Sequence, residues 1–247
     1  MTRATLSTRF IIMHGTNAHW ESGARPTSDL IERVGGLLAA VTSKGALLGA
    51  EGLRPSSQGV RLKFAAGATT IVKGPFAPHQ ELAAGFSIVR GGTLDDPIEF
   101  AKREAGALGD VEIDVRPITE PWDIGLADAP SDAQTRRYMV LRKATPATEA
   151  GEVPTPAQRA MLARLIEEIS QDGQHVVTET MRPSRPGRRY KNSRDGVVFY
   201  DGPFLETKEL LGGYMTVSAA SLDEAGRWAE QYIRAVGADE VDLRELE

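Results

Sequence analysis

The chain has 247 residues, 41% of them hydrophobic and 26% charged, and a formal net charge of −5, which is typical of a globular protein. Neither half is basic overall, so direct binding to nucleic acid is not expected, and the absence of cysteine excludes disulfides and thiol chemistry. No apolar run approaches the roughly 18 residues needed to cross a bilayer, and the run near the N-terminus is too short for a signal peptide core, so we expect a cytoplasmic protein without membrane contact.

The elements predicted for the first half of the chain begin with a short strand at 10–13, whose consecutive apolar residues indicate that both of its faces are covered. Apolar residues at helical spacing then predict a helix around Val34 to Val41 that stops at Gly45. Strand-like stretches follow at 46–53, 59–64 and 68–72. After the corner Gly74-Pro75-Phe76 we expect a strand at 85–90, a helix starting at Thr93 and a strand at 111–116.

The same pattern returns after a connector rich in alanine, aspartate and proline. When Arg9 is aligned with Arg137, 9–119 matches 137–247 without a gap, and 29 of the 111 pairs are identical. Ordinary residue frequencies would give roughly 7. The alignment superposes the two Gly-Pro-Phe corners and predicts a second set of strands and helices, the helices capped at Thr155 and Ser221. We interpret the chain as a first repeat at 9–119, a linker at 120–136 and a second repeat at 137–247, and we call two residues that this alignment pairs counterparts.

Each repeat reads as a ferredoxin-like unit with an added hairpin, which leaves one sheet face without helices. We expect the sheet of the other repeat to pack against that face. The fold class expected is therefore α+β, with two ferredoxin-like repeats packed face to face in an intramolecular pseudo-dimer.

The second repeat resembles the DGPF-motif branch of the YCII-related family, through DGPFLETKELLGGY, SLDEAGRWAEQY and the closing DLREL. The first repeat resembles it through GAEGLRPS, a degenerate KGPF and VEIDVRP. The resemblance implies a dimeric α+β barrel, which the tandem repeats would form within one chain. Enzymatic members use a His–Asp pair with the histidine near the start of the first helix, whereas the corresponding PTSDLIERV and PTPAQRAML contain no histidine.

Candidate catalytic residues are few. His14 and His19 follow the first strand and could shuttle a proton near neutral pH, and Asp201 of the DGPF motif could orient a substrate. The histidines show no metal-binding spacing, and no glycine-rich phosphate loop is present, so neither a metal nor another cofactor is expected. For the Gly-Pro-Phe corner itself, a structural role is the favoured interpretation, because glycine and proline set the backbone of a turn.

Candidate ligand-binding residues are charged groups on strand-like or loop segments. Glu51 and Glu179 lie on partly apolar strand faces, with Arg54 and Arg182 as the nearest expected counter-ions, so a structural ion pair is the alternative to a ligand site. Glu206 and Lys208 follow the second Gly-Pro-Phe corner. Together these residues favour a small anionic organic molecule bound in a cleft, with cofactor-free acid–base catalysis as an extension. The alternative is a non-catalytic interaction or regulatory module, for example a partner of an alternative sigma factor.

Overall fold

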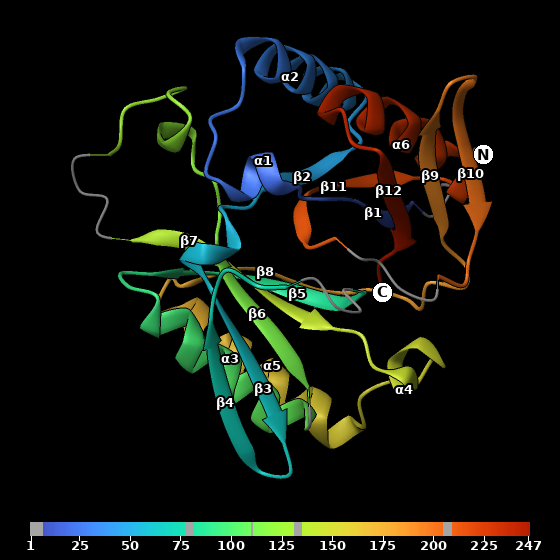
Figure 1. Ribbon diagram of the computed structural model, residues 1–247. Coiled ribbons are helices and arrows are strands. Elements are labelled where there is room, and N and C mark those ends of the chain that lie inside the picture. Colours follow the sequence, from blue (N-terminus) through green and yellow to red (C-terminus); the bar gives the residue numbers. More distant parts are fainter. Residues whose placement is uncertain (1–6, 78–81, 110, 131–134, 205–208) are drawn as a thin grey trace.

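The computed structural model describes residues 7–77, 82–109, 111–130, 135–204 and 209–247. The fold is α+β, with two antiparallel six-stranded sheets in the middle and helices on the outer sides (Figure 1). Within the described ranges, no helix combines the length and the apolar composition that crossing a lipid bilayer requires.

The elements follow the order expected from the sequence, with four short helical segments added. The first part of the chain contains β1 (Thr8–Gly15), α1 (Ala18–Glu21), α2 (Ser28–Ser43), β2 (Leu47–Gly52), the 3₁₀ helix η1 (Ser56–Gln58), β3 (Val60–Ala65), β4 (Ala68–Lys73), β5 (Ala83–Gly91), α3 (Asp95–Leu108), β6 (Glu112–Pro117) and the 3₁₀ helix η2 (Pro121–Asp123). The second part contains β7 (Arg136–Lys143), α4 (Pro146–Glu149), α5 (Pro156–Gln171), β8 (His175–Thr180), β9 (Arg188–Ser193), β10 (Gly196–Asp201), β11 (Leu211–Ala219), α6 (Leu222–Val236) and β12 (Glu240–Glu245).

Each sheet contains strands from both halves of the chain. The first sheet has the order β4-β3-β6-β7-β5-β8, and the second has the order β10-β9-β12-β1-β11-β2. The first strand, helix and second strand of each half thus lie with the later strands of the other half. The structure differs here from the expectation that each half builds a sheet of its own.

The connection between β6 and β7 gives a physical reason for this exchange. Strands that follow one another in the chain tend to lie side by side, and β6 and β7 pair antiparallel from Ile113–Arg142 to Pro117–Tyr138. Glu120 and Asp123 in the connection form ion pairs with Arg137 and Arg136, which holds the connection against the start of β7. β7 therefore occupies the position beside β6 and β5 in the first sheet.

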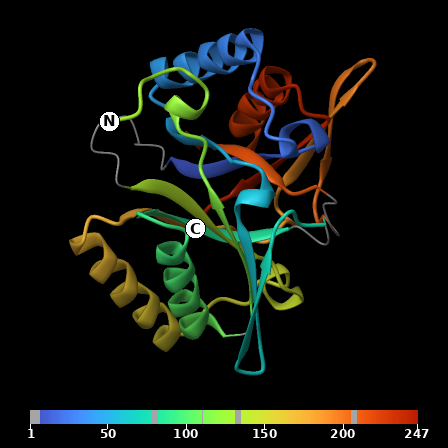
Figure 2. The ribbon, with the colours of Figure 1, turned by 60° about the vertical axis from the view of Figure 1, so that its left-hand side comes forward.

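Alternate residues of the central strands serve two different cores. In β1, Phe10 and Ile12 pack against α2 and α6, whereas Ile11 and Met13 belong to a core that also includes Phe86 of β5. This second core contains residues of both sheets and lies between them, with α2 and α6 on one outer side and α3 and α5 on the other (Figures 1 and 2). The prediction that β1 is covered on both faces is confirmed.

The helix starts follow the predicted capping residues with one exception. Thr155 and Gln158 form the capping box of α5, and the Ser221 hydroxyl accepts a hydrogen bond from the Glu224 N–H at the start of α6. The helix expected at Thr93 begins two residues later as α3, with Leu94 at its N-cap and no side-chain cap.

We expect the substitution Gly35→Ala to raise the free energy of unfolding by about 0.5 to 1 kcal/mol, because glycine is a poor helix former. Gly35 is exposed in the middle of α2, and a methyl group there would meet no atom within 4 Å. Its counterpart in α5 is already Ala163. Urea unfolding of the variant and the wild type measures the difference, and an unchanged or lower stability would contradict the expectation.

Candidate functional site

Two buried clusters hold the segments that cross from one sheet to the other. In the first crossover cluster, defined as Glu21, Ser56 and Arg116, the Glu21 carboxylate accepts hydrogen bonds from the Ser56 N–H and hydroxyl and from the Arg116 guanidinium. Arg116 also donates to the Leu211 carbonyl at 2.6 Å. Because Leu211 belongs to the other sheet, this arginine ties the two sheets together.

The second crossover cluster repeats these contacts with the counterpart residues. Its members are Glu149, Ser184 and Arg244, with the Arg244 guanidinium 3.1 Å from a Glu149 oxygen and 2.6 Å from the Ala83 carbonyl oxygen. Arg244 is 1% exposed. The short helices α1 and α4, which carry Glu21 and Glu149, therefore position the carboxylate of each cluster.

The two Gly-Pro-Phe corners pack against the serines of these clusters. The Phe204 N–H donates to the Ser184 hydroxyl at 3.0 Å, and the Phe204 ring is buried under the Arg189 guanidinium. A methyl group on Gly202 would lie 2.0 Å from the Ser184 carbonyl oxygen, so only glycine allows this close approach. Gly74 and Phe76 make the same contacts with Ser56. The described part of the motif thus has the structural role that the sequence favours.

Beside each corner lies a group of two carboxylates and two cations on adjacent strands. Arg189 contacts Asp242 at 2.7 Å and Glu240 at 3.0 Å, and Lys191 contacts Glu240 at 2.8 Å. Arg61, Lys63, Glu112 and Asp114 form the same arrangement between β3 and β6. Burial raises the pKa of both Asp114 and Asp242, against the opposing effect of the arginine that each contacts.

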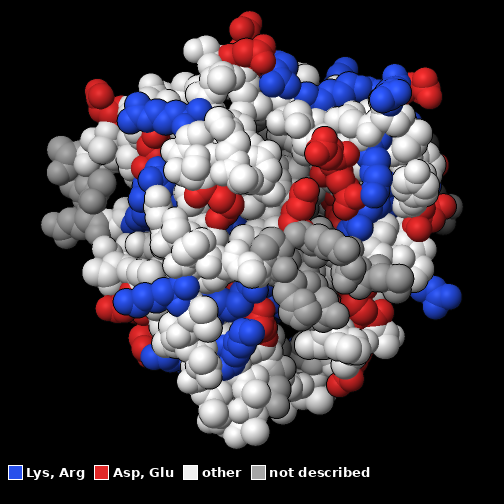
Figure 3. Space-filling model, in the orientation of Figure 1, with Lys and Arg blue, Asp and Glu red and all other residues white. Residues whose placement is uncertain are grey.

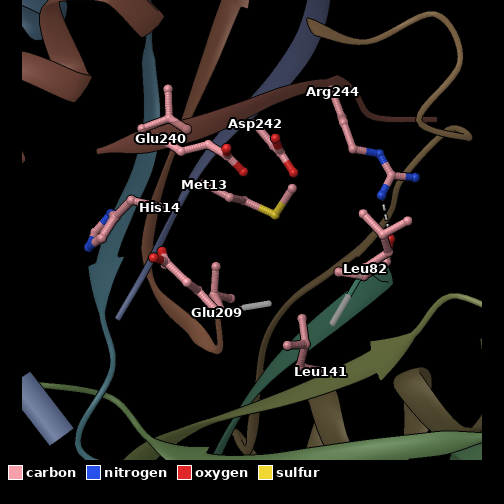
Figure 4. A pocket seen from close by; sticks show the side chains of 12 residues that line it. Met13, His14, Leu82, Leu141, Glu209, Glu240, Asp242 and Arg244 are labelled. Carbon is pink, nitrogen blue, oxygen red and sulfur yellow. Dashed lines mark hydrogen bonds between the residues drawn. The ribbon is translucent and has the colours of Figure 1, made fainter. Parts of the chain in front are cut away.

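A pocket opens between the two sheets next to Asp242. One wall consists of the end of β1 and of β12, and the facing wall is apolar, with Leu82, Leu141 and Ala83 from the first sheet (Figure 4). The carboxylates of Glu209, Glu240 and Asp242 line it together with the Arg244 guanidinium. About 40 Å³ is available to the centres of water-sized groups, which suffices for a small polar group or a few water molecules.

The charges around this pocket are predominantly negative. Burial and the neighbouring carboxylates Glu240 and Asp239 raise the pKa of Glu209. In the space-filling view, acidic side chains gather in a hollow over β11 and β12, with basic side chains beside them (Figure 3). Arg244 is paired with Glu149, and Glu240 and Asp242 are paired with Arg189 and Lys191, so the Glu209 carboxylate adds the excess negative charge, and the pocket favours a cationic or neutral group.

Of the predicted catalytic residues, the structure places only His14 at this pocket. Its Nδ1 atom lies 2.8 Å from the Tyr232 hydroxyl, and burial lowers the pKa of the imidazole to about 4. His19 is exposed on α1 with its ring against Trp20. Asp201 is exposed at the end of β10, where it forms an ion pair with Arg188 at 3.1 Å.

The predicted ligand-binding glutamates have partners other than those expected. Glu179 accepts two hydrogen bonds from Arg9, at 2.6 and 2.8 Å, and Glu51 forms the corresponding ion pair with Arg137. The expected counter-ions, Arg54 and Arg182, were wrong. The reason is that both ion pairs join the two sheets: β1 and β2, with Arg9 and Glu51, lie in the second sheet, whereas β7 and β8, with Arg137 and Glu179, lie in the first.

The remaining candidates lie away from the pocket or outside the described residues. Arg54 contacts Asp123 at 3.2 Å, and Arg182 contacts Glu245 at 2.9 Å. Glu206 and Lys208 fall among the residues that the structure does not describe. Within the described ranges, no group of three histidine, aspartate or glutamate side chains is arranged to hold a metal ion.

The pocket residues that the sequence did not indicate are Gly15, Glu209, Glu240, Asp242 and Arg244. The four charged residues among them are identical to their counterparts in the first half of the chain. Gly15 differs from its counterpart, which is Lys143. A comparison of the two halves for a gain or loss of charge at aligned positions would have drawn attention to this pair.

The comparison with protein families identifies one part of the chain. A family model for the YCII-related domain matches residues 136–245. A YCII-related domain is therefore present here. The α+β fold with antiparallel sheets is consistent with the ferredoxin-like fold that the order of the elements predicted. No curated protein and no solved structure matches the chain.

Proposed function

We propose that the chain is a tandem protein of the DGPF branch of the YCII-related family, in which two repeats build one intramolecular α+β barrel. Several contacts support this proposal because they recur between counterpart residues. They include the two crossover clusters, the two Gly-Pro-Phe corners and the ion pairs of Glu51 and Glu179. The core between the sheets would then be the interior of the barrel.

We further propose that the YCII-related barrel binds a small organic molecule in the pocket beside Asp242. The observation that carries this proposal is the combination of apolar walls with convergent charged groups at the junction of the two sheets, which is typical of ligand sites. An anionic ligand was the expectation from the sequence. Glu209 argues for removing that restriction, because its carboxylate adds negative charge beyond the paired Glu240 and Asp242 and would repel an anion.

Binding is the better supported activity, and acid–base catalysis is an extension of it. His14 lines the pocket, but burial lowers the pKa of its imidazole to about 4, so the ring is a weak base at neutral pH. The proposal therefore does not assign a reaction to the pocket.

A second candidate function is that of an interaction module, and the edge strand β10 favours it. Val198, Phe199 and Tyr200 are 40%, 47% and 57% exposed on this strand. Exposed apolar side chains on a sheet edge are typical of surfaces that pair with another chain. A regulatory partner such as a sigma factor would be recognised there and not at the pocket.

A thermal-shift screen against amines, organic acids, phosphates and aromatic compounds tests the proposed binding. A ligand at 100 times its dissociation constant should stabilise the protein by about 2.7 kcal/mol. In ¹⁵N-resolved NMR spectra, its addition should shift the amide signals of Gly15, Leu211 and Val241, which line the pocket. The signals of Lys143 and Ile113, the counterparts of Gly15 and Val241, serve as controls. The proposal fails if no compound stabilises the protein or if the shifts lie elsewhere.

A further inference from the structure

The two groups of charged residues beside the Gly-Pro-Phe corners differ in one side chain. At the end of β7, the Lys143 amino group lies 2.9 Å from an Asp114 carboxylate oxygen, and Lys143 is only 5% exposed. Its counterpart at the end of β1 is Gly15, which has no side chain; a methyl group there would lie 2.0 Å from a Glu209 carboxylate oxygen, so the Glu209 side chain fills the space next to Gly15. Asp114 therefore contacts an amino group of the protein, whereas its counterpart, Asp242, faces the pocket.

The arginine contacts and the burial of the two carboxylates are alike, whereas Glu209 packs against Gly15 and its counterpart, Glu81, lies outside the described residues. Asp114 is contacted by Arg61 at 2.6 Å and Asp242 by Arg189 at 2.7 Å, and both carboxylates are buried. The pairing of β6 with β7 and of β12 with β1 places Lys143 and Gly15 at matching ends of their strands. The amino group of Lys143 thus indicates which chemical group the pocket beside Asp242 is built to accept.

The form of the pocket agrees with an amino group carried on an apolar stem. Its free volume is about 40 Å³. This is enough for such a group, since one water molecule needs about 10 to 15 Å³ of such volume. Leu82 and Leu141 form the wall opposite Asp242, and Glu209 and Glu240 add negative charge (Figure 4). A chain of methylene groups, like the stem of a lysine, could lie along the apolar wall.

We propose that the pocket binds the primary amino group of a small organic molecule, with Asp242 as its partner in the way that Asp114 is the partner of Lys143. This inference rests on the proposed small-molecule function and names the class of ligand. The ligand's amino group donates hydrogen bonds to the Asp242 carboxylate, Glu240 and Glu209 supply further negative charge, and the stem contacts Leu82 and Leu141. Arg189 keeps its contact with Asp242, as Arg61 keeps its contact with Asp114.

Calorimetric titration with n-butylammonium, n-butanol and butyrate tests the inference on the wild-type protein. These probes share an apolar stem and differ in the polar group. We expect one equivalent of butylammonium to bind, with an affinity about tenfold or more above that of the alcohol, because the alcohol hydroxyl can donate a hydrogen bond to the carboxylate but carries no positive charge. Butyrate should not bind, since it would meet three carboxylates.

Matched variants locate the binding. Glu240→Gln should weaken butylammonium binding several-fold, whereas Glu112→Gln, the corresponding change in the other half, should leave it unchanged. Lys143→Ala removes the internal amino group, so it should lower the thermal midpoint and create a second butylammonium site. Butylammonium should then raise the midpoint of this variant more than that of the wild type. If Lys143→Ala does not fold, the comparison of Glu240→Gln with Glu112→Gln still tests the inference.

The outcomes separate the two proposals. If a compound of another class binds and shifts the Gly15 and Val241 signals while butylammonium does not bind, the amino-group inference is overturned and the proposed function stands. Equal binding of butylammonium and butanol, or equal effects of the Glu240 and Glu112 variants, also overturns the inference. If no compound of any class binds, both proposals are overturned.

Discussion

Replacing Arg244 by methionine is expected to lower the free energy of unfolding by about 3 to 5 kcal/mol, the usual cost of removing one partner of a buried ion pair. The guanidinium contacts the Glu149 carboxylate and donates to the carbonyl groups of Arg182 and Ala83. Without it, a carboxylate and two carbonyl groups lose a donor inside the protein. Urea unfolding followed by circular dichroism measures the loss.

A double-mutant cycle and a surface control make this expectation specific. Glu149→Gln combined with Arg244→Met should cost less than the sum of the single changes, because the uncompensated carboxylate is gone. Arg182→Ala, which removes a half-exposed partner of Glu245, should cost no more than about 1 kcal/mol. A loss below about 1 kcal/mol for Arg244→Met would show that the second crossover cluster does not hold the sheets together.

His14 is expected to make the protein sensitive to acid between about pH 6.5 and pH 4. Burial lowers the pKa of its imidazole from 6.5 to about 4 in the folded protein. The unfolded chain therefore binds the proton first as the pH falls, so stability decreases from pH 6.5 downward until the folded state also binds it. The difference of about 2.5 pKa units corresponds to at most about 3.4 kcal/mol of stability.

Unfolding measurements at pH 7.5 and 4.5 on matched variants isolate this contribution. His14→Gln keeps a polar group near the Tyr232 hydroxyl but cannot gain a proton, so it should lose clearly less stability than the wild type on acidification. His19→Gln, at an exposed position, should behave like the wild type. The attribution to His14 would be wrong if all three proteins lost the same amount.

The polar contact of His14 also differs between the two halves of the chain. The counterparts of His14 and Tyr232 are Arg142 and Glu104. Arg142 lies 3.5 Å from the Glu104 carboxylate, which is fully buried and whose pKa is raised by burial. His14 and Tyr232 thus form a neutral pair at the positions where the other half has the charged pair Arg142 and Glu104. His14 also lines the pocket.

Much of the fold follows from local sequence signals. The strand expected at 59–64 agrees with β3 within one residue at each end, the strand expected at 85–90 lies within β5, and the capping box at Thr155 starts α5. These predictions succeed because the apolar spacing and the caps act over a few residues. The short helices α1 and α4 were missed, although Asn17 and the Thr145-Pro146 pair are capping signals, because one helical turn leaves too few apolar positions for a periodic pattern.

The candidate site was predicted only in part. His14 lies at the pocket, whereas Glu51 on β2 and Glu179 on β8 proved to be members of ion pairs that join the two sheets. Which side chains meet depends on which strands share a sheet and how the two sheets face each other, and the first two strands of each half lie with the later strands of the other half. The partners Arg9 and Arg137 could not be inferred without that topology.

By itself, the sequence determined the element types, the alignment of one half with the other and the resemblance of the second half to YCII-related domains, because periodicity and identity are properties of the linear chain. Only the tertiary structure decided the exchange of strands, the pairing of Arg244 with Glu149 and the pocket beside Asp242. These features depend on contacts between segments far apart in the chain. The sequence shows that Gly15 stands where the other half has Lys143. Only the structure shows that Lys143 contacts the Asp114 carboxylate and that Gly15 lies near the corresponding carboxylate of Asp242.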